Sequence, residues 1–341
     1  MSILTSHPKE HKNDLQRGIG IIGAGAFGTA LALALAPRMQ TIHLYSDLVS
    51  VERAINYLHL NPQFLPGIGL PPHCIGHHKL EKLSDCSTLF LSVPAQGTRA
   101  VCGDLQKHHL SQKTPVIVCS KGIEISSGQF IGEIVASLLP NPVFVLSGPS
   151  FAQEISRGLP TAVTLAGRNE KDILSLQSKI ETSAFRIEAC LDPLGVQIGG
   201  ALKNLLAVGA GFLLGAGLGE DARAVLVTRG FQEMRKIAQE LGGKAETLLG
   251  MSGLGDLLLT CMSSTSRNTT FGLRVARGEI PTPLAQTFSG PLAEGALTAM
   301  AWPKFKDRFP HLDTPLFTAL YQALYTDRPI VDTLQALLSV T

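Results

Sequence analysis

A glycine-rich turn near the start of the chain restricts the possible folds more than any other feature. The apolar run Ile19 to Ile22 precedes the sequence Gly23-Ala24-Gly25-Ala26-Phe27-Gly28, and a helical pattern of small residues continues to Pro37. In a strand, turn and helix of this kind, the first glycine makes the tight turn and the second lets a pyrophosphate approach the backbone. The third lets the helix pack closely on the strand. We therefore expect Gly23, Gly25 and Gly28, with Ala26 and Phe27 between them, to bind a dinucleotide.

The first half of the chain alternates short apolar segments with helical patterns. Six segments have the composition of strands, at Ile19–Ile22, Thr41–Tyr45, Thr88–Val93, Pro115–Val118, Val143–Leu146 and Thr161–Leu165. Unbroken apolar runs of this length are typical of strands that are buried on both faces by crossover helices. These patterns predict an α/β fold with a Rossmann-type, doubly wound parallel sheet.

The second half of the chain has a different pattern. Helical periodicity replaces the strand signals after about residue 192, at Gly195–Leu218, Asp221–Leu241, Pro315–Tyr325 and Ile330–Leu338. We predict a flexible N-terminal tail over residues 1–17, a dinucleotide-binding Rossmann domain over 18–192 and an all-helical, substrate-binding C-terminal domain over 193–341.

Composition excludes several classes of partner. Of the 341 residues, 45% are apolar and 16% charged, and the net charge of +2 gives no field that would attract nucleic acid. The six cysteines are scattered and read as reduced core thiols. The polar start lacks the apolar segment of a signal peptide, which favours a cytoplasmic location. The apolar run Leu205–Leu218 is interrupted by glycines and soon meets Glu220 and Asp221, so we expect no stable membrane insertion.

Two loops that follow predicted strands carry polar groups to the carboxyl edge of the sheet, where doubly wound folds bind ligands. Lys121 follows the strand that ends near Val118. The sequence Ser147-Gly148-Pro149-Ser150-Phe151-Ala152 follows the next strand and opens a helix, so its backbone N–H groups can face an anion or a nicotinamide amide. The alternative interpretations are a solvated loop lysine and a helix cap made by Ser150.

A lysine lies in an unusual environment within the segment Gly199 to Gly209. Its neighbours on the helix, Gly199, Gly200, Leu206 and Ala207, are small or apolar. Lys203 either extends its charged end to water along this surface or acts as an acid/base group whose pKa is lowered by desolvation. The segment by itself leaves both interpretations open.

A carboxylate and a possible phosphate-binding group follow in the same domain. Asp256 lies among glycines and leucines, and Ser266-Arg267-Asn268 follows shortly after it. Arg267 offers a planar set of donors suited to phosphate, and Ser266 and Asn268 add further donors beside it.

A histidine-rich segment could suggest a metal. His73, Cys74, His77 and His78 are close in sequence, but a structural zinc site would need a second pair of ligands, and Pro71-Pro72 indicates a surface loop. We predict no metal.

These motifs together resemble the NAD(P)-dependent glycerol-3-phosphate dehydrogenases of the bacterial type. The resemblance extends from about Ile19 to Leu338 and rests on ordered blocks that read GAGAFGTALA, SVPAQ, CSKG, SGPSFAQE, GGALKN and GLGDLLLTC, with SRN and Ala293-Glu294-Gly295 after them. It implies an enzyme that interconverts dihydroxyacetone phosphate and sn-glycerol 3-phosphate with NAD(P)H and supplies glycerol phosphate for phospholipid synthesis. A homodimer is compatible with the resemblance, which does not decide the oligomeric state.

The resemblance also implies roles for individual residues. Lys203 would be the catalytic acid/base. The substrate site would comprise Lys121, Gly148, Ser150, Asp256, Ser266, Arg267 and Asn268. The cofactor site would comprise the glycine loop, Lys121, Ala152, Arg267, Leu292 and Glu294. Asp47, near the end of the second predicted strand, is expected to join it because its carboxylate can hydrogen-bond a ribose diol.

The chain departs from the family pattern at two places. Ala26-Phe27 stands where relatives often have serine followed by an aromatic residue, which removes one hydroxyl donor to the phosphates. Ser46-Asp47 follows Tyr45 where relatives often carry arginine or histidine. Because a carboxylate can bond a ribose diol but repels a 2'-phosphate, we expect NADH to be used at least as well as NADPH.

Two other functions compete with this one. A β-hydroxyacid dehydrogenase also joins a Rossmann domain to a helical one and uses a lysine, but it should recognise a carboxylate. A non-catalytic dinucleotide sensor would not need the set of Lys203, Asp256 and Arg267.

Overall fold

The computed structural model describes residues 17–108, 110–284 and 289–328. Of the predicted flexible tail, residues 1–16 lie outside the described residues. The predicted helix Ile330–Leu338 lies outside them as well.

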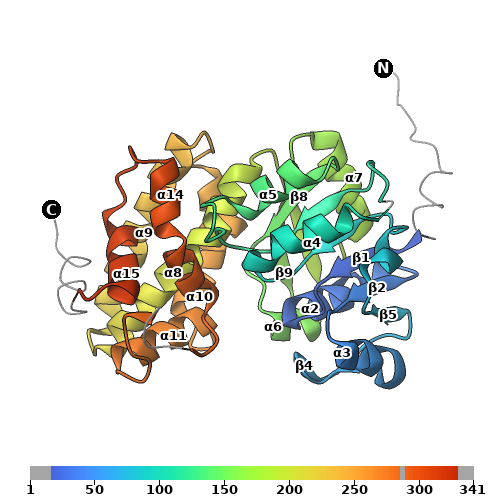
Figure 1. Ribbon diagram of the computed structural model, residues 1–341, viewed down its shortest axis with the longest axis horizontal. Coiled ribbons are helices and arrows are strands. Elements are labelled where there is room, and N and C mark those ends of the chain that lie inside the picture. The colour runs from blue at the N-terminus through green and yellow to red at the C-terminus, as the bar shows by residue number, and fades with distance from the viewer. Residues whose placement is uncertain (1–16, 109, 285–288, 329–341) are drawn as a thin grey trace.

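The first half of the described chain forms one eight-stranded sheet (Figure 1). Its strands are β1 (Ile19–Ile22), β2 (Ile42–Tyr45), β5 (Cys74–His77), β6 (Leu89–Leu91), β7 (Val116–Val118), β8 (Val143–Ser147), β9 (Thr161–Ala166) and β10 (Phe185–Cys190). They lie in the order β10-β9-β8-β7-β6-β1-β2-β5, which is doubly wound about β1 and β6. The predicted fold class is confirmed.

The sheet is not wholly parallel, which corrects the prediction. Strand β9 pairs with β8 antiparallel, and β10 pairs with β9 parallel, so the last two strands run against the other six. The connection between β8 and β9 contains one short helix, α6 (Ala152–Ser156). A parallel neighbour requires a longer crossover that returns the chain to the opposite edge of the sheet.

Strands β5 and β10 were missed by the sequence analysis. The segment after Pro71-Pro72, interpreted as a surface loop, forms the edge strand β5 and pairs with β2 from Cys74 to His77. Strand β10 alternates buried and exposed residues over its first four positions, as an edge strand does.

Helices cover both faces of this sheet, because alternate side chains of the central strands point to opposite sides. Phe90 and Ile117 pack in one cluster with α2 (Ala26–Leu35) and α7 (Glu170–Ile180). Leu91 and Val118 pack in a second cluster with α4 (Thr98–Leu105) and α5 (Ile131–Leu138). The shorter elements of this half are the helices η1 (Ala36–Arg38), α3 (Val49–Arg53), η2 (Ala54–Leu58), η3 (Leu80–Leu83) and η4 (Ala95–Gly97), and the strands β3 (Leu60–Asn61) and β4 (Leu65–Gly69).

Within the described ranges, the second half of the chain is helical, as predicted. Helix α8 (Pro193–Gly215) packs against α9 (Gly219–Glu240), α10 (Asp256–Met262), α11 (Arg267–Ala276), α13 (Glu294–Met300) and α15 (Pro315–Tyr325), with η5 (Thr247–Leu249), η6 (Met251–Gly255) and α14 (Trp302–Arg308) beside them (Figure 1). Asp192 caps the start of α8 by accepting a hydrogen bond from Gly195 N, 2.8 Å away. Helix α11 crosses α8 so closely that a Cβ added to Gly211 would lie 2.0 Å from Thr269 O.

Helix α8 is long and apolar enough to cross a membrane, with a mean hydropathy of 1.5. The protein itself buries 89% of its most apolar window, which is the environment of a core helix. All six cysteines are free thiols, and all but the half-buried Cys190 are buried, as expected of reduced core residues.

Candidate active site

The glycine loop lies between β1 and α2, at the edge where β1, β2, β6, β7 and β8 end. Gly23 has φ +109° and lies against Ser92, where a Cβ would come within 2.6 Å of the carbonyl oxygen. A Cβ on Gly28 would lie 2.0 Å from Gly23 O, so both positions require glycine for packing. Gly25 is different, because nothing lies within 4 Å of its Cβ position. This open space suits a ligand that approaches the backbone, as a pyrophosphate does.

The other predicted cofactor residues of this half lie around the same loop. Ala26 and Phe27 form the first turn of α2 and are half-buried. The N–H groups of Gly23 and Ala24 both donate to Tyr45 O, at 3.0 and 2.8 Å, which ties the loop to the end of β2. Asp47 lies two residues beyond that carbonyl and is exposed.

The two halves meet at a buried cluster of charges. Helix α8 carries Lys203, and Asp256 is the first residue of α10. Their Nζ and Oδ1 atoms are 2.5 Å apart, with only 7% and 1% of each residue exposed. The second carboxylate oxygen of Asp256 accepts a hydrogen bond from Lys121 Nζ at 2.6 Å, and Lys121 also donates to Gly148 O at 3.3 Å. One carboxylate therefore holds two ammonium groups.

Thr260 belongs to this cluster and Asn204 follows Lys203 on α8; the sequence predicted a role for neither. Thr260 Oγ1 accepts a hydrogen bond from Lys203 Nζ at 2.8 Å and donates to Asp256 O at 2.7 Å. Its spacing of four residues from Asp256 on one helix is a signal that could have identified it. Asn204 Oδ1 accepts a hydrogen bond from Asn268 Nδ2 at 3.0 Å, a contact between distant segments that no local pattern indicates.

The cluster determines the protonation of Lys203. Burial has the largest effect and lowers the pKa of the ammonium; Asp256 raises it again and Lys121 lowers it further, so that it falls to about 8. Burial raises the pKa of Asp256, but the two ammonium groups outweigh burial and hold it below its ordinary value. At neutral pH, Lys203 can therefore exist as both the acid and the base beside a fixed carboxylate.

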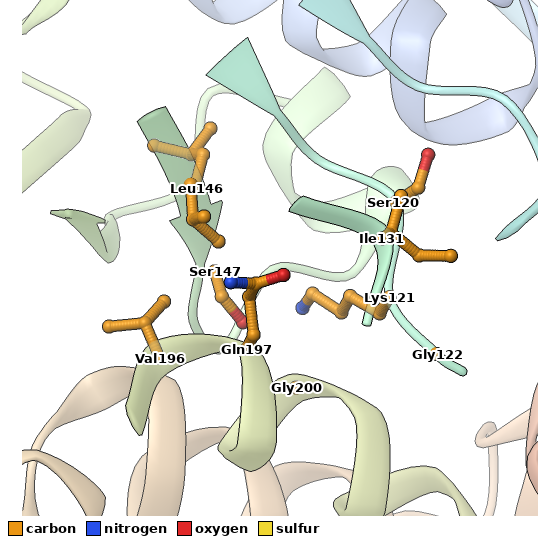
Figure 2. Close-up of a pocket in the computed structure, with 10 residues that line it drawn as sticks. Ser120, Lys121, Gly122, Ile131, Leu146, Ser147, Val196, Gln197 and Gly200 are labelled. Atoms are coloured by element: carbon orange, nitrogen blue, oxygen red, sulfur yellow. The ribbon is translucent and has the colours of Figure 1, made fainter. Parts of the chain in front are cut away.

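A narrow pocket adjoins this cluster between the sheet and α8. Figure 2 shows the Lys121 side chain extending into it toward Ser147 and Gln197. A Cβ on Gly200 would lie 2.9 Å from Ser147 Oγ and 3.4 Å from Lys121 Cγ, so glycine on α8 makes room for the lysine stem. Ser147 Oγ is buried without a hydrogen-bond partner in the described part of the chain, so the wall of this pocket offers an unused polar atom.

The loop after β8 brings its predicted residues to the same place. Gly148 has φ +157° and packs against Val163, where a Cβ would lie 2.8 Å from the Cα atom. Ser150 Oγ donates to Gly148 O at 2.8 Å instead of capping α6. Ala152 begins α6, near the loop.

The remaining predicted residues lie on α11 and α13. Ser266 caps α11, its hydroxyl accepting a hydrogen bond from Thr269 N at 3.3 Å. Arg267 begins that helix and is exposed, and its side chain makes no hydrogen bond or ion pair with the described residues. Asn268 Oδ1 accepts a hydrogen bond from Gly295 N at 2.8 Å, which links α11 to α13.

Glu294, the first residue of α13, has a buried Oε2 without a partner among the described residues. Burial raises the pKa of this carboxyl, and Arg267 partly opposes the shift. Leu292, two residues earlier, is half-buried against the helical core.

The histidine-rich segment lies elsewhere, at the far edge of the sheet. His77 Nε2 and His43 Nδ1 are 2.9 Å apart, and His78 pairs with Glu52. Burial raises the pKa of the Cys74 thiol to about 12, which disfavours the thiolate that a metal needs. Among the residues that the structure describes, no group of three or more histidine, cysteine and acidic side chains could hold a metal.

Comparison with known proteins agrees with this geometry. Residues 18–173 match the family described as NAD-dependent glycerol-3-phosphate dehydrogenase N-terminus, and residues 192–335 match the corresponding C-terminus. The chain belongs to this family. Its relatives include the glycerol-3-phosphate dehydrogenase [NAD(P)+] of Hyphomonas neptunium, 41% identical over 94% of each chain, and that of Zymomonas mobilis, 44% identical over 76% of this chain and 75% of the relative.

A solved structure supports the same assignment. The crystal structure of glycerol-3-phosphate dehydrogenase from Coxiella burnetii has a TM-score of 0.87 and 33% identity, and covers 94% of this chain and 98% of its own. Membership in this family favours an NAD(P)-dependent glycerol-3-phosphate dehydrogenase over a β-hydroxyacid dehydrogenase or a non-catalytic dinucleotide sensor.

Proposed function

We propose that this member of the glycerol-3-phosphate dehydrogenase family reduces dihydroxyacetone phosphate to sn-glycerol 3-phosphate with NADH or NADPH, and catalyses the reverse reaction. The observation that carries the proposal is the buried network of Lys203, Asp256 and Lys121 at the carboxyl edge of the sheet. The product is the glycerol backbone on which phospholipid synthesis begins.

Lys203 is the proton donor in this proposal. When bound, the dinucleotide supplies the hydride that reaches the carbonyl carbon. The carbonyl π electrons then move to oxygen, and the Lys203 ammonium transfers a proton to that oxygen and becomes a neutral amine. In the oxidative direction the amine takes the hydroxyl proton back. A pKa of about 8 makes both forms available near neutral pH.

The partners of Lys203 hold it in place. Asp256 and Thr260 both bond its Nζ, which leaves one ammonium hydrogen for the substrate oxygen. Lys121 occupies the other oxygen of Asp256 and keeps the carboxylate ionised as the proton moves. We assign Lys121, Gly148 and Ser150 to the part of the substrate site that the sheet half contributes.

The start of α11 would bind the phosphate group of the substrate. Arg267 is exposed and leaves its donors available, and the helix N-terminus adds backbone N–H groups to them. Asn268 is held by hydrogen bonds to Asn204 and to Gly295, and so it can fix the position of the start of α11. Since the Ser266 hydroxyl caps the helix, its contribution is to fix this N-terminus.

The dinucleotide would bind along the glycine loop. The open space beside Gly25 can accept the pyrophosphate, and Ala26 and Phe27 present the N-terminus of α2. Asp47 would face the ribose, Ala152 the nicotinamide half, and Arg267, Leu292 and Glu294 would contact the cofactor from the helical side. The unpartnered Glu294 Oε2 supports a role in binding a donor group.

We place the division between the two domains at residues 192 and 193, where Asp192 caps α8. We propose that the enzyme works in the cytoplasm without membrane insertion, and the burial of α8 inside the protein supports the second point. A homodimer remains a prediction.

The reaction is tested by oxidation of NADH in the presence of dihydroxyacetone phosphate, with product identified as sn-glycerol 3-phosphate. Unphosphorylated dihydroxyacetone and a β-hydroxyacid serve as comparison substrates. Turnover that requires the phosphate supports the proposal. Preferred turnover of the β-hydroxyacid, or NADH binding without any turnover, would overturn it.

A further inference from the structure

A buried asparagine outside the recognised motifs holds the glycine loop. Asn61, in β3, is 1% exposed, and its Nδ2 donates to Ala24 O and to Thr29 Oγ1, both at 2.8 Å. Its Oδ1 is buried without a partner in the described part of the chain. The Asn61 amide is therefore held only through its Nδ2 group, which donates one hydrogen bond to the glycine loop and one to helix α2.

The chain takes an unusual path to place this side chain. His59 ends the helix η2 in a left-handed conformation, with φ +51°, a region that residues with a Cβ seldom adopt. Its carbonyl oxygen then accepts a hydrogen bond from Leu70 N at 2.8 Å, which closes the hairpin of β3 and β4. Strand β4 packs against both α2 and α6, the helices that open from the two ligand-facing loops (Figure 1).

The peptide that Asn61 holds is the one between Ala24 and Gly25. In a trans peptide the C=O and N–H groups point in opposite directions. Because Asn61 draws the Ala24 carbonyl into the interior, the Gly25 N–H points away from it, on the residue whose Cβ side is open. An N–H fixed in this way before binding loses no conformational freedom when a phosphate oxygen arrives.

We propose that Asn61 is a positioning residue for the dinucleotide: it fixes the Ala24–Gly25 peptide so that the Gly25 N–H is aimed at the pyrophosphate. The inference rests on the proposed function for its ligand. Thr29 supports the same peptide, since its hydroxyl accepts from Asn61 and lies 3.5 Å from Ala24 O.

The test measures NADH affinity directly, by fluorescence titration without a second substrate. Asn61→Ala should raise the Kd for NADH about tenfold, equivalent to about 1.4 kcal/mol. Asn61→Asp keeps the shape but replaces the donor nitrogen with a charged oxygen near the pyrophosphate, so it should weaken binding further. In both variants, kcat at saturating NADH and the KM for dihydroxyacetone phosphate should stay within about twofold of wild type.

Asn56→Ala is the matched control. Asn56 lies in η2 of the same crossover and bonds Gly76 through both side-chain atoms, at 3.1 and 2.7 Å, away from the glycine loop. It should reduce thermal stability without changing the Kd for NADH. Thr29→Val, which keeps the side-chain shape, should raise the Kd by a smaller factor and covers the case in which Asn61 variants fail to fold.

Two results would overturn the inference: an unchanged Kd for NADH in folded Asn61→Ala or Thr29→Val, or an equal rise in Asn56→Ala. If the wild-type protein binds NADH but does not turn over dihydroxyacetone phosphate, the proposed reaction is wrong. The ratio of the Kd for NADH in Asn61→Ala to that in wild type would still decide the role of Asn61.

Discussion

The sheet half and the helical half of this protein offer different chemical groups to the ligands that we propose. The glycine loop offers backbone N–H groups beside an open space, and the side chains nearby serve to shape the backbone. In the helical half the groups are charged side chains buried beside one another, such as Lys203 and Asp256. Variants in the first region should therefore change cofactor affinity, and variants in the second should change the chemical step or the binding of the substrate phosphate.

The strongest test of this contrast is Lys203→Met, which keeps most of the stem volume and removes the proton. Positioned acid/base groups contribute about 10² to 10⁴ in rate, so kcat should fall by that order in both directions. The Kd for NADH should stay nearly unchanged. Lys236→Met, at an exposed position of α9, is the control and should retain full activity. Wild-type turnover by Lys203→Met would leave this lysine a purely structural role.

Arg267→Ala should have the next largest effect. Loss of one partner of a desolvated charge pair costs about 2 to 5 kcal/mol, and because Arg267 is exposed in the free protein we expect about 2, or thirtyfold in kcat/KM for dihydroxyacetone phosphate. The loss for unphosphorylated dihydroxyacetone should be much smaller. Arg274→Ala, on the same helix and paired with Glu279, should match wild type. Equal losses of kcat/KM on both substrates would show that Arg267 does not bind the phosphate.

A pair of glycine substitutions separates recognition from packing within the loop. Gly25→Ala meets nothing within 4 Å, so its melting temperature should equal that of wild type while the Kd for NADH rises about tenfold or more. Gly28→Ala places a Cβ 2.0 Å from Gly23 O, so it should lower the free energy of unfolding by about 1 to 3 kcal/mol. Calorimetry and NADH titration measure the two effects. If Gly25→Ala lowered the melting temperature and left the Kd for NADH unchanged, Gly25 would serve packing, as Gly28 does, and not ligand binding.

The two halves also differ in how much the sequence reveals. The glycine loop could be predicted with its strand and helix because all its parts are local. The environment of Lys203 showed that the residue was unusual but not which way its pKa moves, because that depends on Asp256 and Lys121 from distant segments. The antiparallel β9, the edge strand β5 and the contact of Asn61 with Ala24 likewise depend on tertiary pairing.

The pH dependence of turnover should follow Lys203. Its pKa is lowered to about 8, so the neutral amine increases as pH rises through that value. The kcat/KM for glycerol phosphate oxidation should rise about tenfold for each pH unit below 8 and level off above it, because kcat/KM reports the pKa of the free enzyme. Reduction of dihydroxyacetone phosphate needs the ammonium and should decline above pH 8. Profiles of kcat/KM in both directions test this, and a midpoint near that of an ordinary lysine would contradict the desolvated environment.

The smallest expected effect concerns Asp47, the one side chain in the sheet half to which we assign a direct choice between cofactors. It is exposed two residues beyond the end of β2, so its repulsion of a 2'-phosphate is screened by solvent and amounts to about 1 kcal/mol. Wild type should use NADH at least as well as NADPH, and Asp47→Ser should improve kcat/KM for NADPH about fivefold with little change for NADH. Ratios of kcat/KM for the two cofactors, measured at fixed ionic strength, give the answer. A wild-type preference for NADPH of about a hundredfold, or about 2.7 kcal/mol, would mean that cations other than those placed here govern the choice, and that side-chain charge rather than backbone dominates recognition in this half too.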